Sequence, residues 1–284
     1  MDLSHLTRHA GGTQDLVDLA PDHPGFNDLE YRQRRNEIAQ LSLSFRSGDP
    51  VPVVEYSRAE HRVWEIVWDS LREGHARWAC RESRALQSVL PLNPSRIPQL
   101  EEVNSRLMGV SGFRMEPVAG LIQSRTFLRY LGKRVFLSTQ YMRHSSRPLY
   151  TPEPDVVHEL IGHAATLVHP GIAELNRLMG LAADVADEEE MVLISNVYWY
   201  TLEFGVVMED GHPKAFGAGL LSSGGELERI GSGAVALLDW DLDKISETGF
   251  DPTQFQDSLF VAPNFTRILT DVSAWIRAGG WRRS

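Results

Sequence analysis

Cysteine is almost absent from this sequence, which contains only Cys80 among its 284 residues. A single cysteine excludes a disulfide within the chain and suits a reducing compartment. No apolar run reaches the roughly 18 residues that a membrane-spanning helix needs. The opening segment MDLSHLTRHAGG also lacks the apolar core of a secretory signal peptide. We therefore expect a cytoplasmic protein that does not cross a membrane.

Positive charge is in deficit as well. Lysine and arginine total 28 against 38 aspartates and glutamates, which gives a formal net charge of −10. Such a balance opposes non-specific binding to nucleic acid. The hydrophobic content of 42% is sufficient for a sizeable core in a chain of this length. Residues 1–20 are polar and lack periodicity, so they are predicted to form a mobile arm before a domain that spans 21–284.

Two histidines and a glutamate carry the strongest chemical signal. His158 and His163 lie in the motif HELIGH, and Glu203 lies in YWYTLEFG. Two imidazoles and one carboxylate form a facial set of ligands for a divalent transition metal and leave coordination positions open for oxygen or substrate. We interpret these three residues as a catalytic iron site.

The spacing of the histidines predicts a local distortion of their helix. In the HExxH helix of zinc proteases the histidines are four residues apart, whereas His158 and His163 are five apart. Five steps of about 100° leave two side chains about 140° apart on a regular α-helix, so both can reach one metal only if the helix bends, bulges or ends. Gly162 lowers the cost of such a distortion. A zinc hydrolase with Glu159 as general base is thus disfavoured, and a protein that binds without turnover is the remaining alternative.

The pattern of apolar and capping residues predicts a mainly α fold with a few short β-strands in a single domain. Capping boxes are expected at Ser57 with Glu60 and at Asp187 with Glu190, and Asp210-Gly211 predicts a hairpin turn. The acidic segment after Gly231 is expected to be a solvated connection. Helices are expected over 29–43, 58–77, 80–92, 99–108, 124–131, 187–207 and 264–276, with β structure near 113–121, 135–141, the hairpin and 255–265.

Ten blocks of sequence occur in order along nearly all of the chain from about residue 20: DHPGF (22–26), YRQRR (31–35), VEYSRAEHRVW (54–64), RIPQLEEV (96–103), PVAGL (117–121), TQYMRH (139–144), YTPEPD (150–155), HELIGH (158–163), YWYTLEFG (198–205) and FGAGLLSS (216–223). Together they resemble the tetrahydropterin-dependent aromatic amino acid hydroxylases. The resemblance implies that 21–284 is a catalytic domain of the phenylalanine hydroxylase type. We expect this chain to have room for neither the regulatory domain nor the tetramerising helix of animal members, which favours a monomer or weak dimer.

The resemblance also implies a reaction. Ferrous iron, a tetrahydropterin similar to tetrahydrobiopterin, and dioxygen as co-substrate would hydroxylate the ring of a free aromatic L-amino acid. Conversion of phenylalanine to tyrosine is the favoured reaction. The alternatives within the family are 3-hydroxylation to meta-tyrosine and hydroxylation of tyrosine or tryptophan.

Further site residues follow from the same resemblance. The pterin would be held by Gly120, Leu121, Ile122, Ser124, Phe127 and Glu159, with Phe127 stacked on its ring. The substrate would be held by Arg143 at its carboxylate, by Ser222 and Glu226 at its amino acid end, and by a pocket of Thr151, Pro154, Trp199 and Phe204.

Four further positions are informative. Asp155 precedes His158 by three residues, where it can cap the helix or accept a hydrogen bond from a ligand imidazole. Leu137 stands where phenylalanine- and tryptophan-type members usually carry histidine, and Pro252 fits neither the phenylalanine-type nor the tyrosine-type pattern. Trp199 lies four residues before Glu203, which predicts an aromatic wall beside the metal. Tryptophan-type members of the family tend to carry phenylalanine at this position, so the resemblance favours phenylalanine or tyrosine as the substrate.

Overall fold

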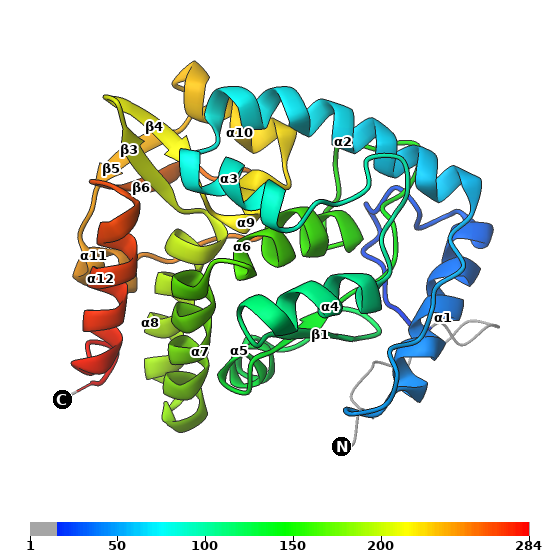
Figure 1. Ribbon diagram of the computed structural model, residues 1–284, viewed down its shortest axis with the longest axis horizontal. Helices are drawn as coiled ribbons and strands as arrows, with labels where there is room; N and C mark the ends of the chain where they lie inside the picture. Colours follow the sequence, from blue (N-terminus) through cyan, green and yellow to red (C-terminus); the bar gives the residue numbers. More distant parts are fainter. Residues whose placement is uncertain (1–15, 284) are drawn as a thin grey trace.

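Helices make up most of the secondary structure in the computed structural model, which describes residues 16–283 (Figure 1). The α-helices are α1 (Leu29–Ser44), α2 (Arg58–Trp78), α3 (Arg81–Val89), α4 (Leu100–Val110), α5 (Ser124–Gly132), α6 (Ala165–Leu167), α7 (Pro170–Val185), α8 (Glu188–Tyr198), α9 (Ala218–Leu221), α10 (Gly224–Ser232), α11 (Leu242–Glu247) and α12 (Phe265–Arg277). Two π-helices are η1 (His158–Ala164) and η2 (Trp199–Glu203). The strands are β1 (Arg114–Pro117), β2 (Val135–Ser138), β3 (Val206–Glu209), β4 (His212–Ala215), β5 (Ala236–Asp239) and β6 (Ser258–Ala262). The predicted mainly α class is confirmed.

Local capping determines where helices α2 and α8 begin. At α2 the Ser57 hydroxyl accepts from the Glu60 N–H at 3.2 Å, and the Glu60 carboxylate accepts from the Ser57 N–H at 2.6 Å. Asp187 and Glu190 form the equivalent box at α8. Both capping boxes are therefore confirmed.

The predicted helix over 187–207 is wrong at its C-terminal end. The α-helix gives way to the π-helix η2 at Trp199, and the helical segment ends at Glu203. The Phe204 N–H donates to the carbonyl of Trp199, five residues back, at 2.7 Å. The chain then enters β3, whose backbone groups pair with β4 and β6 instead of continuing the helix.

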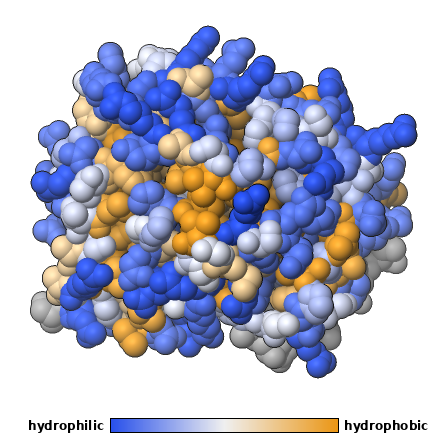
Figure 2. All heavy atoms as spheres, in the orientation of Figure 1, coloured by the Kyte–Doolittle hydropathy of each residue, from blue (hydrophilic) through white to orange (hydrophobic). Residues whose placement is uncertain are grey.

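The core connects the long helices of the molecule. Val63, Trp64, Val67 and Leu71 form the buried stripe of α2 and pack into a cluster that extends as far as α12. In Figure 1, α2 runs along the upper edge, and α1 and α12 lie at opposite sides of the view. Figure 2 shows this face as mostly hydrophilic, with hydrophobic surface in separate patches, which is normal for a folded domain.

Two small sheets complete the fold. The four-stranded sheet has the order β4–β3–β6–β5, and β1 pairs with β2 in parallel in a separate two-stranded sheet. In the larger sheet Val206 lies opposite Ala215 on β4 and opposite Val261 on β6. The hairpin between β3 and β4 turns at Asp210 and Gly211, whose φ angles of 51° and 77° are both positive, as a type I′ turn requires.

The acidic segment after Gly231 is more structured than the sequence indicates. Strand β5 is exposed along its whole length, as expected of a surface connection. Helix α11, however, is capped by the Asp241 carboxylate and buries Ile245 completely. Because α11 packs against α8, this segment covers one side of the helix that leads to Glu203.

A close helix crossing positions the segment that the sequence assigns to the pterin. Helix α5 begins at Ser124 and crosses α7 where Gly132 meets Gly180. A Cβ added to Gly180 would lie 2.0 Å from the backbone nitrogen of Gly132, so the two backbones are in direct contact. Arg125 reinforces the crossing, because its Nη1 donates to the carbonyl of Ala186 at 2.6 Å.

The predicted arm over 1–20 lies largely outside the described residues, which begin at 16. Within the described part, Leu19 is buried, and the Leu16 N–H donates to the Asn36 side chain at 2.8 Å. No helix between residues 16 and 283 combines the length and hydropathy needed to cross a membrane. The cytoplasmic location and the monomer or weak dimer stay predictions.

Candidate metal centre

The two π-helices carry the three proposed ligands. His158 and His163 lie on η1, and Glu203 is the last residue of η2. Hydrogen bonds from i to i+5 bring side chains five residues apart onto one face, so the predicted distortion of the HELIGH helix is confirmed. The reason for Gly162 is packing rather than backbone freedom. A Cβ at this position would lie 2.6 Å from the carbonyl oxygen of Ala218, so glycine is what allows α9 to contact η1.

The ligand atoms converge on one point. His163 Nε2 lies 2.9 Å from Glu203 Oε1 and 3.0 Å from His158 Nε2, and His158 Nε2 lies 3.7 Å from Glu203 Oε2. Adjacent ligands of an octahedral ion with bonds of about 2.1 Å lie about 3 Å apart, which matches this spacing. Within residues 16–283 this is the one cluster of three or more such side chains with converging ligand atoms. The donor set and its geometry fit a divalent iron.

Burial sets the protonation of these groups. Burial, together with the neighbouring His163, lowers the pKa of His158 to about 4, so His158 is neutral near pH 7. Burial opposes the charged form of Glu203, but the adjacent His163 outweighs it and holds the pKa of the carboxyl below its usual value. The pKa of His163 is raised in turn, because the attraction of Glu203 exceeds the effect of burial. The carboxylate of Glu203 and the neutral imidazole of His158 thus face the point where the ligand atoms converge.

Ser222 fixes the orientation of one ligand. Its hydroxyl donates to the carbonyl of Ala218 at 2.8 Å and lies 3.0 Å from His158 Nδ1. Since the hydroxyl proton is used on Ala218, the oxygen accepts from Nδ1–H. This tautomer directs the Nε2 lone pair toward His163 and Glu203, as a metal ligand requires.

Asp155 serves as a cap and as the partner of Arg143. Its Oδ1 accepts from the His158 backbone N–H at 3.3 Å, which is one of the two predicted roles. The other role, acceptance from a ligand imidazole, is filled by Ser222 instead. Arg143 Nε and Nη2 donate to the two Asp155 oxygens at 2.8 and 2.7 Å, and both side chains are buried. Burial would raise the pKa of Asp155, but the facing guanidinium holds it below its usual value.

This ion pair affects the predicted role of Arg143. The edge of its guanidinium formed by Nε and Nη2 is engaged by Asp155, while the one hydrogen bond of Nη1 within residues 16–283 is to the Pro148 carbonyl at 3.5 Å. The half-buried Thr151 and Pro154 lie in the irregular segment between Arg143 and η1. There the Thr151 hydroxyl donates to the Glu153 carbonyl at 2.7 Å.

Of the residues assigned to the pterin, Phe127 is connected to the metal ligand His163 through the ring of Phe136. Phe127 is half-buried and packs edge-on against Phe136 at 5.2 Å and Tyr198 at 5.8 Å. Phe136 in turn lies 4.5 Å from the His163 ring, measured between centroids. In the loop before α5, Gly120 is buried, Ile122 is half-buried, and Leu121 and Ser124 are exposed.

Glu159 is the one buried carboxyl among these pterin residues. Its Oε1 accepts from the Thr139 N–H at 3.1 Å and from the Thr139 hydroxyl at 2.9 Å. Burial raises its pKa to about 7. Leu137, the departure from the family pattern, is buried on β2 two residues before Thr139.

Trp199, the first residue of the π-helix that ends at Glu203, is the centre of an aromatic wall, and the place of this wall beside the metal stays a prediction. Trp199 contacts Phe204 at 4.6 Å between ring centroids and stacks on Phe250 at 4.1 Å with an interplanar angle of 7°. Its indole N–H donates to Gln256 Oε1 at 2.8 Å. Sequence reasoning missed Phe250 and Gln256. The aromatic Phe250 within an otherwise acidic stretch was an available signal, whereas nothing in the sequence distinguishes Gln256.

Glu226, on α10, is connected to Trp199 through Gln256. Its Oε1 accepts from the Gln256 backbone N–H at 3.0 Å, while its buried Oε2 forms no hydrogen bond within residues 16–283. Burial raises the pKa of this carboxyl. Ser223, not Ser222, caps α10, since the Ser223 hydroxyl accepts from the Glu226 N–H at 3.3 Å. Pro252 is exposed in the loop that contains Phe250 and Gln256.

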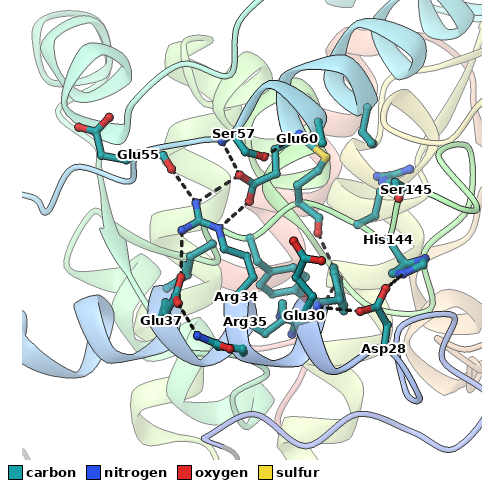
Figure 3. A pocket seen from close by; sticks show the side chains of 18 residues that line it. Asp28, Glu30, Arg34, Arg35, Glu37, Glu55, Ser57, Glu60, His144 and Ser145 are labelled. Atoms are coloured by element: carbon teal, nitrogen blue, oxygen red, sulfur yellow. Dashed lines mark hydrogen bonds and ion pairs between the residues drawn. The ribbon is translucent and has the colours of Figure 1, made fainter.

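A cavity of about 520 Å³ opens elsewhere, between α1, the start of α2 and residues 141–145 (Figure 3). None of the three proposed ligands lines it. Arg34 donates to both oxygens of Glu60 at 2.9 and 3.2 Å. Arg35, which also lines the cavity, donates to Glu153 at 2.6 Å, whereas its buried Nε and Nη2 form no hydrogen bond within residues 16–283. Arg143, the residue assigned to the substrate carboxylate, lines the cavity as well.

Comparisons with known proteins agree with this geometry. The family model described as biopterin-dependent aromatic amino acid hydroxylase matches residues 3–278. The chain is 46% identical over 249 residues to the chloroplastic phenylalanine 4-monooxygenase of Chlamydomonas reinhardtii, covering 88% of this chain and 69% of that protein. It is 39% identical over 267 residues to the tyrosine 3-monooxygenase of Schistosoma mansoni, covering 93% of this chain but only 57% of that protein.

A solved structure matches as well. The phenylalanine hydroxylase of Chromobacterium violaceum, with bound iron(III) and oxidised 7,8-dihydrobiopterin, aligns with a TM-score of 0.75 at 27% identity. The alignment covers 84% of this chain and 90% of that one.

Proposed function

Since this chain belongs to the family of biopterin-dependent aromatic amino acid hydroxylases, we propose that it hydroxylates the ring of a free aromatic L-amino acid, with phenylalanine to tyrosine as the favoured reaction. The resemblance drawn from the ordered sequence blocks is thereby confirmed. The observation that carries the proposal is the convergence of His158, His163 and Glu203 beside Trp199.

The three ligands would hold the iron. A facial set of two imidazoles and one carboxylate would leave coordination positions open to small molecules. When bound, ferrous iron and the tetrahydropterin supply the activation of dioxygen and the electrons for ring hydroxylation. The Ser222 hydroxyl holds the proton on Nδ1 of His158, so that Nε2 stays available to the metal. Phe136 packs on His163 and keeps water from that side of the ligand.

We assign the pterin to the loop at residues 120–124 and to Phe127. The half-buried ring of Phe127 offers a face for stacking against a flat heterocycle, since two other aromatic rings already hold it edge-on. Glu159 uses its Oε1 for both bonds from Thr139. Its second oxygen would accept from the N–H edge of the pterin.

We assign the substrate's ring to the wall of Trp199 and Phe204, with Pro154 on the segment before η1. Within residues 16–283 the buried Oε2 of Glu226 forms no hydrogen bond and has the Arg229 guanidinium 3.9 Å away. A buried carboxylate oxygen without a hydrogen bond gains one when an ammonium binds, which supports a site for the substrate ammonium here. For the substrate carboxylate, Arg143 offers Nη1, since Asp155 engages Nε and Nη2. Proximity and orientation are the protein's contribution to the reaction.

Tyrosine is the second candidate substrate. The Schistosoma mansoni relative is named a tyrosine 3-monooxygenase, so likeness to the family does not separate the two substrates. Regiochemistry is open in the same way, because a shift of the ring against Trp199 changes which carbon lies nearest the metal. Hydroxylation of phenylalanine at the 3-position would follow from such a shift.

Product analysis tests the proposal. The protein is loaded with ferrous iron and supplied with tetrahydropterin, oxygen and, in turn, phenylalanine, tyrosine and tryptophan, and products are separated against isomeric standards. We expect para-tyrosine from phenylalanine. We also expect Glu203→Ala and His163→Ala to lose both bound iron and product, and retained hydroxylation in either variant would contradict the assignment. Hydrolytic activity that depends on zinc and not on pterin would favour the zinc hydrolase.

A further inference from the structure

Gln256 is a buried residue in the loop between α11 and β6, and its side-chain amide is fully bonded. Oε1 accepts from the Trp199 indole N–H at 2.8 Å, and Nε2 donates to the carbonyls of Gln254 at 3.0 Å and Asp251 at 3.2 Å. An indole nitrogen can only donate and a backbone carbonyl can only accept, so the partners determine which way the amide faces. The side chain has one arrangement that satisfies all three.

The backbone of Gln256 is held just as firmly by α10. Its N–H donates to Glu226 Oε1 at 3.0 Å, and its carbonyl accepts from Arg229 Nη2 at 3.2 Å. The loop therefore cannot move away from α10 without breaking two bonds, one to a buried carboxylate. Gln256 thus transmits the position of α10 to the indole of Trp199.

Trp199 is connected directly to the metal centre. It is the first residue of η2 and Glu203 is the last, and the bond from the Phe204 N–H to the Trp199 carbonyl closes the turn between them. On its outer face Trp199 stacks on Phe250, which lies in the same loop as Gln256. The loop thus contacts Trp199 twice: Phe250 stacks on the indole, and Gln256 Oε1 accepts from the indole N–H.

We propose that Gln256 is a specificity-determining positioning residue, whose bond to Trp199 sets where the wall of Trp199 and Phe250 stands relative to Glu203. The position of this wall decides which carbon of the bound ring lies nearest the metal. The inference rests on the proposed hydroxylase function and deepens it. Gln256 acts through Trp199 and need not touch the substrate. It accordingly affects the choice of product and the efficiency of hydroxylation rather than the binding of iron.

Gln256→Met is the primary test, because methionine preserves length and removes both hydrogen-bonding groups. Gln254→Met is the matched control, since Gln254 is an exposed glutamine in the same loop. The measurements are iron content, kcat and KM for phenylalanine, the ratio of tyrosine isomers, and tyrosine formed per tetrahydropterin oxidised. For Gln256→Met we expect normal iron content, a changed isomer ratio, and a drop of at least about twofold in tyrosine per pterin oxidised, because a displaced ring is a poorer target. The control should match the wild type.

A double-mutant cycle isolates the hydrogen bond. Trp199→Phe removes the donor and leaves the other bonds of Gln256 in place, so Gln256→Met should change the isomer ratio much less in that background than in the wild type. Equal effects in both backgrounds would overturn the role of the bond. If Gln256→Met does not fold, Trp199→Phe alone decides, and an unchanged isomer ratio and unchanged coupling overturn the inference.

The two levels of the proposal fail differently. A wild-type enzyme that forms no hydroxylated product from any aromatic amino acid overturns the hydroxylase function and this inference with it. A wild-type enzyme that hydroxylates, with Gln256→Met giving the same isomer ratio and the same coupling, overturns only the role of Gln256.

Discussion

Ser222→Ala tests whether the outer contacts of the metal centre control iron binding. The Ser222 hydroxyl is the acceptor for Nδ1–H of His158 and donates in turn to the Ala218 carbonyl. Its removal leaves both groups without this partner and frees the imidazole to rotate or to adopt the other tautomer. Loss of such an outer partner typically costs about 10–100-fold in metal affinity or activity. Because His158 is one of only three ligands, we expect a loss of iron affinity within that range.

Ser223→Ala is the matched control for this experiment. Ser223 is the adjacent serine, but its hydroxyl caps α10 by accepting from the Glu226 N–H. We expect this variant to lose about 1 kcal/mol in the free energy of unfolding, as is typical of a lost N-cap, and to keep its iron affinity. Iron affinity is measured by competition with a chelator, and stability by chemical denaturation of the metal-free protein. Equal iron affinity in Ser222→Ala and Ser223→Ala would refute the argument that Ser222 orients His158.

Three further predictions concern packing and charge. Asp155→Asn keeps the shape of the cap but leaves Arg143 as a buried charge without its counterion, so we expect a loss of about 3–5 kcal/mol in the free energy of unfolding by denaturant titration. Gly162→Ala places a methyl group against the Ala218 carbonyl and should destabilise the protein by about 1–3 kcal/mol in the same assay. Gly109 lies on α4 with open space around it, so Gly109→Ala should stabilise the protein slightly. Burial raises the pKa of the Cys80 thiol from 9.0 to about 11, so at pH 8 the folded protein holds about 100-fold less thiolate than an ordinary cysteine. Alkylation of Cys80 by iodoacetamide should therefore be slow in the folded protein, become faster as the pH rises, and become fast on unfolding.

Features that depend on neighbouring residues were predictable from the sequence. The capping boxes of Ser57 and Asp187 involve partners only three residues away, and both form as expected. The five-residue spacing of the histidines likewise required a distorted helix, because geometry alone excludes a regular one. In each case the pattern and the interaction lie within one or two turns of chain.

Features that depend on distant partners were not predictable. The segment ending at Glu203 has helical periodicity up to about Val207, but β3 requires an extended chain from Val206 and the helix ends early. The bond between Trp199 and Gln256 joins residues 57 positions apart, so no local pattern indicates it. For Asp155 the sequence allowed two roles, but its ion pair with Arg143, twelve residues away, becomes visible only in the fold.

The two π-helices explain why metal ligation and the substrate wall form one unit. A π turn inserts an extra residue into a helix and persists only where the surrounding structure compensates its cost. In η1 that compensation is the contact with α9, which requires Gly162 and also delivers Ser222 to His158. In η2 the turn places Trp199 and Glu203 at its two ends, so the same short segment of backbone carries the indole and the ligand. A change in substrate choice is therefore more readily made in the loop around Gln256, which contacts the indole from outside, than within the ligand-bearing helices themselves.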